Sequence, residues 1–238
     1  MRKGIIGTAL ASVCVAVLVV SGCSENINEL KENARAKALS EPVMAAEETE
    51  EEGTEEESVS PEQMDLIKYN YYVELNNEIV KLMDDIDYYY EVVEYDEEFA
   101  LIPDSGYTYG YRIRGFGKDL ADDCIQLADM EPAYETLDPL IKEMAEPLKE
   151  LMAAFSEVSR SNDYAANQYQ KAKELHAVIY PAADEFEPMG YEFIHAVSAV
   201  ADERIAAEEE EMKAEGRLIA YNASRGISIA GQIMDECT

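Results

Sequence analysis

Apolar residues recur every three or four positions over most of the chain from residue 61 onward, a spacing that predicts amphipathic helices. The clearest stretch covers about residues 61–93, and its apolar face is formed by Met64, Ile67, Tyr71, Leu75, Ile79, Leu82, Ile86, Tyr90 and Val93. Ser60-Pro61-Glu62-Gln63 precedes it. A serine at the N-cap, a proline at the first helical position and a glutamine three residues after the cap together indicate a capping box. We therefore predict one long helix that begins directly after Ser60.

Further helical segments follow a loop that we expect over residues 103–117, where Gly and Pro interrupt the pattern. We expect Pro139 and Pro147 to kink the third helix or to split its beginning, and Pro181 to end the fourth. No convincing alternating strand pattern occurs. The predicted fold class is all-α, an antiparallel helix bundle of about five or six helices. The later helices are expected at about 116–128, 132–159, 164–181, 186–216 and 217–234.

The amino-terminal residues have the pattern of an export signal. Arg2 and Lys3 precede an apolar run over residues 4–20 that is short for a membrane span. Val20-Ser21-Gly22-Cys23 resembles the lipobox of bacterial lipoproteins, in which the cysteine is diacylglycerylated and becomes the new amino terminus. We predict a signal peptide over residues 1–22 and a membrane anchor at Cys23. The alternative is an uncleaved transmembrane anchor in which Cys23 is incidental.

Either form of anchor places the rest of the chain outside the cytoplasm. We expect it to be tethered to the cell membrane, or to the outer membrane if the host has two. Residues 41–60 contain nine glutamates and no basic residue. Like-charge repulsion and low hydrophobicity disfavour folding of such a segment. The predicted organisation is therefore a lipid-anchored, disordered acidic linker over residues 23–60, followed by a helical bundle domain over residues 61–238.

The charge of the chain restricts its partners. Its formal net charge is −32, and removal of residues 1–22 would delete two basic residues and no acidic one, leaving −34. Binding to nucleic acid or to an anionic lipid surface needs clustered Lys and Arg. We therefore expect no nucleic-acid partner and a membrane association that depends on the modified Cys23. Cationic partners and metal ions remain open.

Three phrases in the chain resemble one family in the same order. They are residues 68–77 (KYNYYVELNN), residues 167–176 (NQYQKAKELH) and residues 218–222 (LIAYN). Together they resemble the YiiG-like bacterial lipoprotein family over roughly residues 60–236. The resemblance implies a helical extracytoplasmic domain with no established activity. It carries over no catalytic or binding residue.

One pair of residues has the spacing of a metal motif. Glu192 and His195 form Glu-x-x-His, which places both side chains on one face of a helix, as in di-iron bundles. Such sites need a second motif and two further glutamates. His176 follows Glu174 at the wrong spacing to supply that motif. A surface or interhelix histidine is therefore the favoured interpretation of His195.

Motifs for other chemistry are absent from the sequence. There is no Gly-x-Ser-x-Gly elbow, no calcium loop and no phosphate-binding glycine loop. Neighbouring acids such as Asp84-Asp85 are most simply solvated helix faces. We therefore expect no catalytic residue and no cofactor. Cys124 and Cys237 are the two cysteines of the predicted domain, and their spacing does not decide whether they pair.

Tyrosine is the most distinctive local feature, because ten tyrosines lie between residues 69 and 111. Exposed tyrosine is a favoured contact for proteins, and its ring also suits stacking on sugars. We take Tyr107, Tyr109 and Tyr111 in the predicted loop as a candidate ligand surface. The alternative is that the rings pack between the helices with their hydroxyls at the edge.

These observations favour a lipid-anchored extracytoplasmic helical binding or scaffold module of the bacterial cell envelope, with an envelope protein or glycan as partner. Two other hypotheses stay open. A metal-handling bundle using Glu192 and His195 needs at least two more ligands at the same point. A carboxylate-dependent envelope enzyme needs a deep pocket with two convergent acids.

Overall fold

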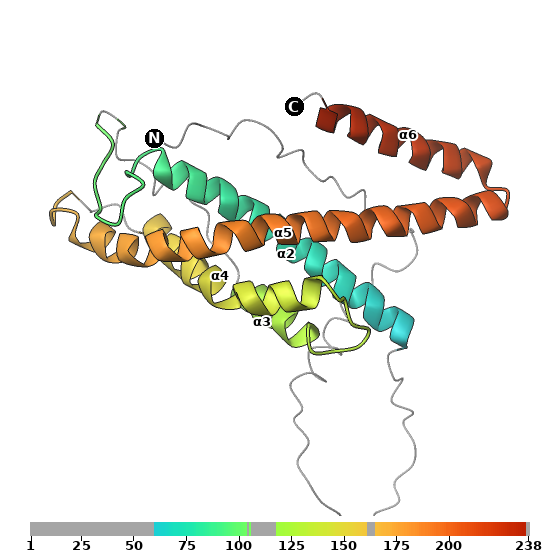
Figure 1. The fold of residues 1–238 in the computed structure, drawn as a ribbon, viewed down its shortest axis with the longest axis horizontal. Helices are drawn as coiled ribbons and strands as arrows, with labels where there is room; N and C mark the ends of the chain where they lie inside the picture. The colour runs from blue at the N-terminus through green and yellow to red at the C-terminus, as the bar shows by residue number, and fades with distance from the viewer. Residues whose placement is uncertain (1–59, 104, 106–117, 161–164, 237–238) are drawn as a thin grey trace, which may run out of the picture. The chain divides into compact units, whose positions relative to one another are not determined.

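The computed structural model describes residues 60–103, 105, 118–160 and 165–236. Over these ranges the chain forms five helices and no strand, with one isolated antiparallel bridge between Val93 and Leu101 (Figure 1). The all-α prediction is confirmed. Cys23, the linker, the tyrosines at 107, 109 and 111, and Cys237 lie outside the described residues. The helices are α2 (Pro61–Tyr90), α3 (Lys118–Leu127), α4 (Leu137–Arg160), α5 (Gln170–Ala214) and α6 (Leu218–Glu236).

The beginning of α2 is the capping box that the sequence predicts. The Gln63 backbone N–H donates to Ser60 Oγ over 3.2 Å, and the Ser60 N–H donates to Gln63 Oε1 over 2.8 Å. Pro61 is the first helical residue, where a backbone N–H is not needed. The boundary is therefore fixed by local chemistry that needs no tertiary contact.

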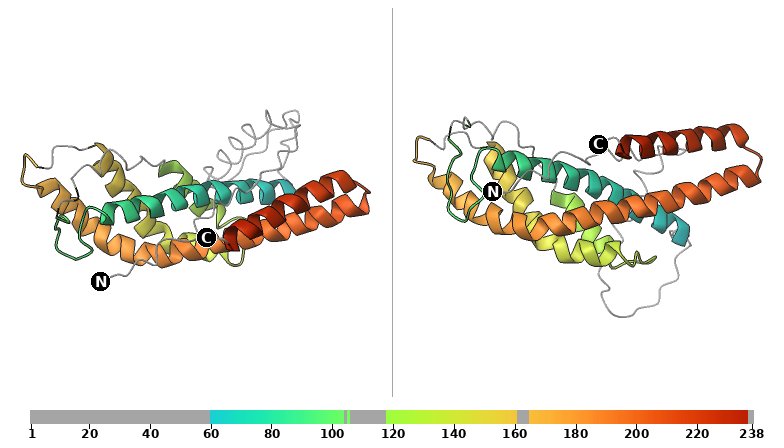
Figure 2. Two further views of the ribbon diagram at one scale, coloured as in Figure 1. Left: turned by 90° about the horizontal axis from the view of Figure 1, so that it is seen from above. Right: turned by 45° about the horizontal axis from the view of Figure 1, so that its top comes forward.

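Two compact units make up the described chain, and the division falls inside α5 between Ile194 and His195. In the unit before this point, α2 and α4 run in the same direction, because the beginning of α4 contacts the beginning of α2 and Phe155 contacts Tyr89 near its end. The first part of α5 runs the opposite way, since His176 contacts Tyr89 and Phe193 contacts Tyr72. Figure 2 shows α2 beside this part of α5 in two further views.

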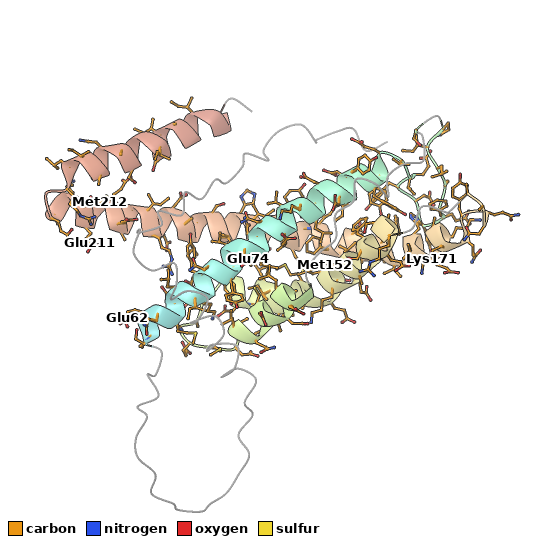
Figure 3. All side chains as sticks on the ribbon, turned by 180° about the vertical axis from the view of Figure 1, so that it is seen from behind. Glu62, Glu74, Met152, Lys171, Glu211 and Met212 are labelled. Carbon is orange, nitrogen blue, oxygen red and sulfur yellow. The ribbon has the colours of Figure 1, made fainter. Side chains whose placement is uncertain are left out.

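The short helix α3 runs in the direction opposite to that of α4. Lys149 of α4 pairs with Asp122, and Lys142, two turns earlier in α4, pairs with Asp129 just beyond the end of α3. The helix α3 is therefore antiparallel to α4, and the unit is an antiparallel bundle. Its core includes Met152 of α4, labelled in Figure 3, which is 2% exposed.

The sequence pattern underestimates the buried surface of α2. The predicted face is largely buried, but a neighbouring line of residues is also buried because α2 is covered from more than one side. Tyr71 and Tyr90 are only partly buried, whereas Tyr72 and Tyr89 are fully enclosed. The helix also ends at Tyr90, so Val93 is buried outside it. The additional buried positions are Lys68, Tyr72, Asn76, Met83, Asp85 and Tyr89.

The prediction that Pro181 ends a helix is wrong, because α5 is continuous from Gln170 to Ala214. Pro181 and Pro188 are both exposed and lie seven residues apart on one face. The carbonyl groups that lose their N–H partners belong to the exposed residues Ala177 and Asp184, where water can bond to them. On the opposite face, burial of Ala172, Ile179, Ala183, Phe186 and Phe193 continues past both prolines and stabilises the helix.

The predicted start of the third helix is also wrong. The helix α4 begins at Leu137, five residues after Pro132, and Pro139 falls in its first turn. The residues before α4 make other contacts instead: the carbonyls of Met130 and Pro132 accept from Lys68 Nζ over 2.7 and 2.9 Å, and the Tyr134 N–H donates to the Asp138 side chain over 2.8 Å. Pro147 lies inside α4 without dividing it. The segment that precedes α4 is thus held against Lys68 of α2.

The second unit contains α5 from His195 onward and α6. Gly216 joins the two helices with a φ of 76°, a left-handed conformation that glycine adopts without strain. Its N–H donates to Lys213 O over 3.2 Å, and the Arg217 N–H donates to Met212 O over 2.8 Å. These two bonds form a Schellman cap. Figure 3 labels Glu211 and Met212 just before this turn.

Candidate functional site

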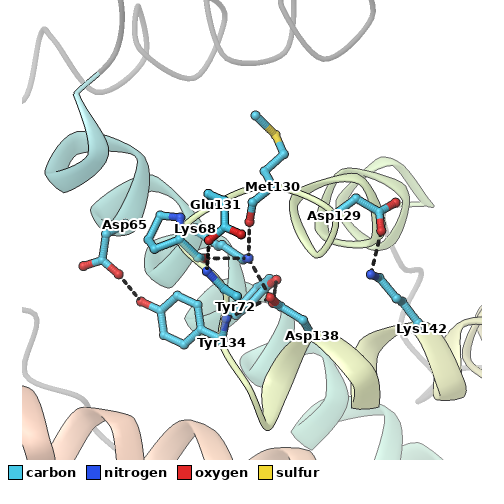
Figure 4. Close-up of polar contacts among 11 residues, drawn as sticks. Asp65, Lys68, Tyr72, Asp129, Met130, Glu131, Tyr134, Asp138 and Lys142 are labelled. Carbon is cyan, nitrogen blue, oxygen red and sulfur yellow. Dashed lines mark hydrogen bonds and ion pairs between the residues drawn. The ribbon is translucent and has the colours of Figure 1, made fainter.

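A buried ion pair joins α2 to the first turn of α4. Lys68 is completely buried, and its Nζ lies 2.8 Å from Oδ2 of Asp138 (Figure 4). The same ammonium group donates to Met130 O over 2.7 Å and to Pro132 O over 2.9 Å. An ammonium group has three N–H donors, so all of them are used. We call Lys68, Tyr72, Tyr134 and Asp138 the lysine cluster.

Asp138 is the acceptor at the centre of the lysine cluster. Its Oδ1 accepts from the Tyr72 hydroxyl over 2.6 Å, and its Oδ2 also accepts from the Tyr134 N–H over 2.8 Å. The rings of Tyr72 and Tyr134 lie 5.9 and 5.5 Å from Lys68 Nζ, within range of a cation–π attraction. The charge of each partner is thus compensated where water is excluded.

The lysine cluster also keeps Tyr72 protonated. Burial raises the pKa of the Tyr72 hydroxyl far above its ordinary value, and its hydrogen bond to Asp138 raises that pKa further. A phenol held neutral in this way is a poor general base or nucleophile at neutral pH. The lysine cluster therefore has a structural role: it stabilises the packing of α2 against the start of α4.

A second buried cluster surrounds His176 at the other end of the bundle. His176 is 1% exposed, and its Nε2 lies 2.7 Å from the carbonyl oxygen of Asp96. A carbonyl oxygen only accepts, so Nε2 carries a proton. In the neutral ring Nδ1 then accepts from the Tyr89 hydroxyl, 2.8 Å away. The histidine is thereby fixed in orientation between α2 and the loop that follows it.

Aromatic rings enclose this histidine. The ring centroids of Tyr89, Phe99 and Tyr180 lie 5.9, 5.7 and 5.9 Å from that of His176. Tyr95 extends the group towards solvent: its hydroxyl donates to Asp184 over 2.9 Å, and its side chain is 38% exposed. We call His176 and these four aromatic residues, Tyr89, Tyr95, Phe99 and Tyr180, the histidine cluster. It attaches residues 91–103 to α5.

Cys124 is a buried free thiol in α3. Its Sγ lies 3.6 Å from Tyr71 O, and burial raises the pKa of the thiol above its ordinary value. The thiolate is the reactive form of cysteine, so this thiol is unreactive at neutral pH. Cys237, the other cysteine of the predicted domain, lies outside the described part of the chain.

The candidate metal ligands lie on the surface of α5. Glu192 and His195 are each exposed. Within residues 60–103, 105, 118–160 and 165–236, no three His, Cys, Asp or Glu side chains converge as a metal site would require. Searched over the same ranges, no helix is both long and apolar enough to cross a membrane.

Sequence reasoning did not single out either cluster. Lys68 and His176 were assigned no buried role, because charged and polar residues are expected at the surface. One signal was available for Lys68: with Tyr72 and Asn76 it forms a line at spacings of four beside the apolar face. No local signal identified their distant partners, which lie 70 and 87 residues away in the chain.

The described chain is thus an all-helical protein in which buried polar clusters fasten the helices. The model of the family described as "Protein of unknown function (DUF3829)" matches residues 63–238. The chain belongs to this family. No curated protein and no solved structure matches the chain.

Proposed function

We propose that the protein is a lipid-anchored extracytoplasmic binding or scaffold module of the bacterial cell envelope, and that within its family it is a YiiG-like lipoprotein. A non-enzymatic role is supported by one observation: the buried side chains that could carry out chemistry are all held in structural contacts. Lys68 has all three donors bonded, both ring nitrogens of His176 are bonded, and Cys124 is an enclosed thiol. Each of these groups holds one helix against another element.

The anchor is supported by the amino-terminal sequence. Two basic residues, an apolar run and Val20-Ser21-Gly22-Cys23 follow one another in the order that a lipoprotein signal peptide requires. A single acyl chain binds a membrane only weakly, so stable anchoring needs a second chain or another membrane-binding feature. The diacylglycerol on Cys23 would supply two acyl chains. The acidic residues 41–60 then act as a spacer between the membrane and the helices.

Intact-mass spectrometry of the membrane-associated protein from its native host tests the anchor. We expect a mass that corresponds to cleavage before Cys23 plus the acyl chains, and loss of this form in a Cys23→Ala variant. A Cys124→Ala variant is the matched control, since it removes a cysteine and should leave the acylation unchanged. An unprocessed and unacylated wild-type chain would refute the lipid anchor.

The binding role has its own test. We propose Tyr107, Tyr109 and Tyr111 as the contact surface for an envelope protein or glycan. Co-sedimentation with purified cell-wall glycan and chemical cross-linking in envelope membranes separate these two partners. Replacing the three tyrosines by alanine should reduce whichever signal the wild type gives. Tyr191→Ala is the control, because Tyr191 is an exposed tyrosine of α5 outside the candidate surface. Wild-type levels of binding in the triple variant would exclude this surface.

A further inference from the structure

A series of ring contacts leads from the surface of the first unit into its core. The Tyr95 side chain is 38% exposed, and its ring centroid lies 4.8 Å from that of Tyr90. The Tyr90 ring lies in turn 5.1 Å from the ring of Tyr89, which is only 1% exposed. Both separations are those of aromatic rings in direct contact. Three tyrosines therefore connect the solvent to a buried phenol.

Each end of this series has a hydrogen-bonded proton acceptor. The Tyr95 hydroxyl donates to Oδ1 of Asp184 over 2.9 Å. The Tyr89 hydroxyl donates to Nδ1 of His176 over 2.8 Å. The other ring nitrogen, Nε2, already carries a proton, which it donates to the Asp96 carbonyl oxygen over 2.7 Å. Nδ1 is therefore the nitrogen that takes up a proton, and the contact with Asp96 is kept when it does so.

The two acceptors determine where a missing electron is most stable. A phenol that loses an electron becomes a strong acid, so its oxidation is favoured where a base takes up the departing proton. Imidazole is a stronger base than a carboxylate. An electron vacancy that enters at Tyr95 is therefore more stable on Tyr89, whose proton moves to His176.

The other fully buried tyrosine of α2, Tyr72, is in a different position. Its hydroxyl donates to Asp138, but that carboxylate is already paired with the Lys68 ammonium group and is a poor proton acceptor. Burial and this hydrogen bond raise the pKa of the Tyr72 hydroxyl far above its ordinary value. Burial alone thus does not favour oxidation of a tyrosine, and the imidazole acceptor distinguishes Tyr89 from Tyr72.

We propose that Tyr89, Tyr90 and Tyr95 form a tyrosine relay that reduces one-electron oxidants such as peroxyl radicals and holds the resulting vacancy on Tyr89. The oxidant takes one electron from Tyr95, whose proton moves to Asp184. A peroxyl radical then leaves as a hydroperoxide, with a proton from water. Tyr95 regains an electron from Tyr89 through Tyr90, and it regains its proton from Asp184. Tyr89 becomes a neutral radical, and its proton rests on Nδ1 of His176.

The relay keeps the radical in an enclosed place. A tyrosyl radical at the surface couples with a second tyrosine to form dityrosine, whereas the Tyr89 ring is closed off from other molecules. A soluble reductant such as ascorbate supplies one electron, and His176 returns the proton, which restores Tyr89. Tyr89 and His176 keep their structural contacts throughout, because only an electron and a proton move. This activity is independent of the proposed lipid anchor and of the proposed contact surface.

Photo-oxidation of the full-length protein in mild detergent tests the relay. The probe is tris(bipyridine)ruthenium with persulfate, a cationic one-electron oxidant that the acidic chain attracts. Electron paramagnetic resonance after freeze-quenching gives the yield and lifetime of the tyrosyl radical. Tyr89→Phe keeps the ring but removes the phenol and its base, so it should shorten the lifetime by on the order of tenfold or more. It should also increase dityrosine cross-links between molecules.

Two further variants separate entry of the vacancy from its storage. Tyr95→Phe should slow the formation of the long-lived radical without changing its lifetime, because the pair of Tyr89 and His176 is intact. Tyr191→Phe is the matched control, since Tyr191 is an exposed tyrosine of α5 outside the relay (49% exposed). It should change neither the rate nor the lifetime.

The wild-type radical also carries a signature of the proton acceptor. After exchange into heavy water, electron–nuclear double resonance should detect one deuteron between the Tyr89 oxygen and His176 Nδ1. This measurement needs no substitution, so it tests the proposal even where a variant fails to fold.

Three results would overturn the proposal. A radical as long-lived in Tyr89→Phe as in the wild type, with the variant folded by circular dichroism, would place the vacancy elsewhere. An unchanged rate of formation in Tyr95→Phe would exclude Tyr95 as the point of entry. Absence of the deuteron coupling in the wild type would exclude His176 as the proton acceptor.

Discussion

Replacing Lys68 by methionine should destabilise the first unit strongly. Methionine keeps most of the apolar stem but removes the ammonium group. The Asp138 carboxylate, whose side chain is only 9% exposed, then loses its counter-ion, and two carbonyl groups lose their donor. Breaking a buried ion pair from one side costs about 3–5 kcal/mol. This is a large part of the roughly 5–15 kcal/mol by which a typical domain is stable.

A double-mutant cycle separates the interaction energy of the ion pair from the other effects of each substitution on stability. Asp138→Asn alone leaves the Lys68 ammonium group buried without its counter-ion, and the double variant removes both charges. Residues in direct contact show coupling energies of about 0.5–3 kcal/mol. We therefore expect the double variant to be more stable than the sum of the two single changes predicts. Urea unfolding followed by circular dichroism gives the three free energies.

Lys142→Met is the matched control for this experiment. Lys142 lies 2.6 Å from Asp129, but the side chains are 45% and 73% exposed. Exposed ion pairs contribute roughly 0–1 kcal/mol, so this change should have a small effect. Equal losses for Lys68→Met and Lys142→Met, or additive effects in the cycle, would refute the argument that the lysine cluster fastens α2 to α4.

Three further predictions concern single positions. Gly190→Ala brings its new Cβ to 2.5 Å from the terminal methyl group of the buried Met83 and to 3.1 Å from the Phe186 ring, so it should give a lower melting temperature than Gly231→Ala, which meets nothing within 4 Å and should stabilise α6 by up to about 1 kcal/mol; equal melting temperatures would contradict this. His176→Phe should speed amide hydrogen exchange in residues 91–103, because it removes the donor to the Asp96 carbonyl; unchanged exchange would contradict that role. Burial raises the pKa of the Cys124 thiol above 9.0, so the folded chain keeps the proton where the unfolded chain releases it. Stability should therefore fall as pH rises above about 9, by up to about 1.4 kcal/mol per pH unit, and a Cys124→Ala variant should show a shallower fall in urea unfolding at each pH.

The sequence determined the features that depend on neighbours in the chain. The start of α2 was predicted to the residue, because Ser60, Pro61 and Gln63 form the capping box among themselves. The all-α class and most of the buried apolar positions followed from spacings of three and four, because every helix must bury its apolar face. Gly216 was likewise expected to end a helix, and it does so through a local cap.

Tertiary structure alone decided the rest. Pro181 does not end α5, because packing of the opposite face outweighs the lost hydrogen bonds and the freed carbonyls face water. The pairing of Lys68 with Asp138 spans 70 residues of the chain, and the pairing of His176 with Tyr89 spans 87 residues. The exposure of Ile219 and Ile227 on α6 also became visible only in the structure, where Ser224 and Arg225 face Glu209 of α5 instead. Such contacts depend on which faces meet in space, and periodicity along the chain carries no information about that.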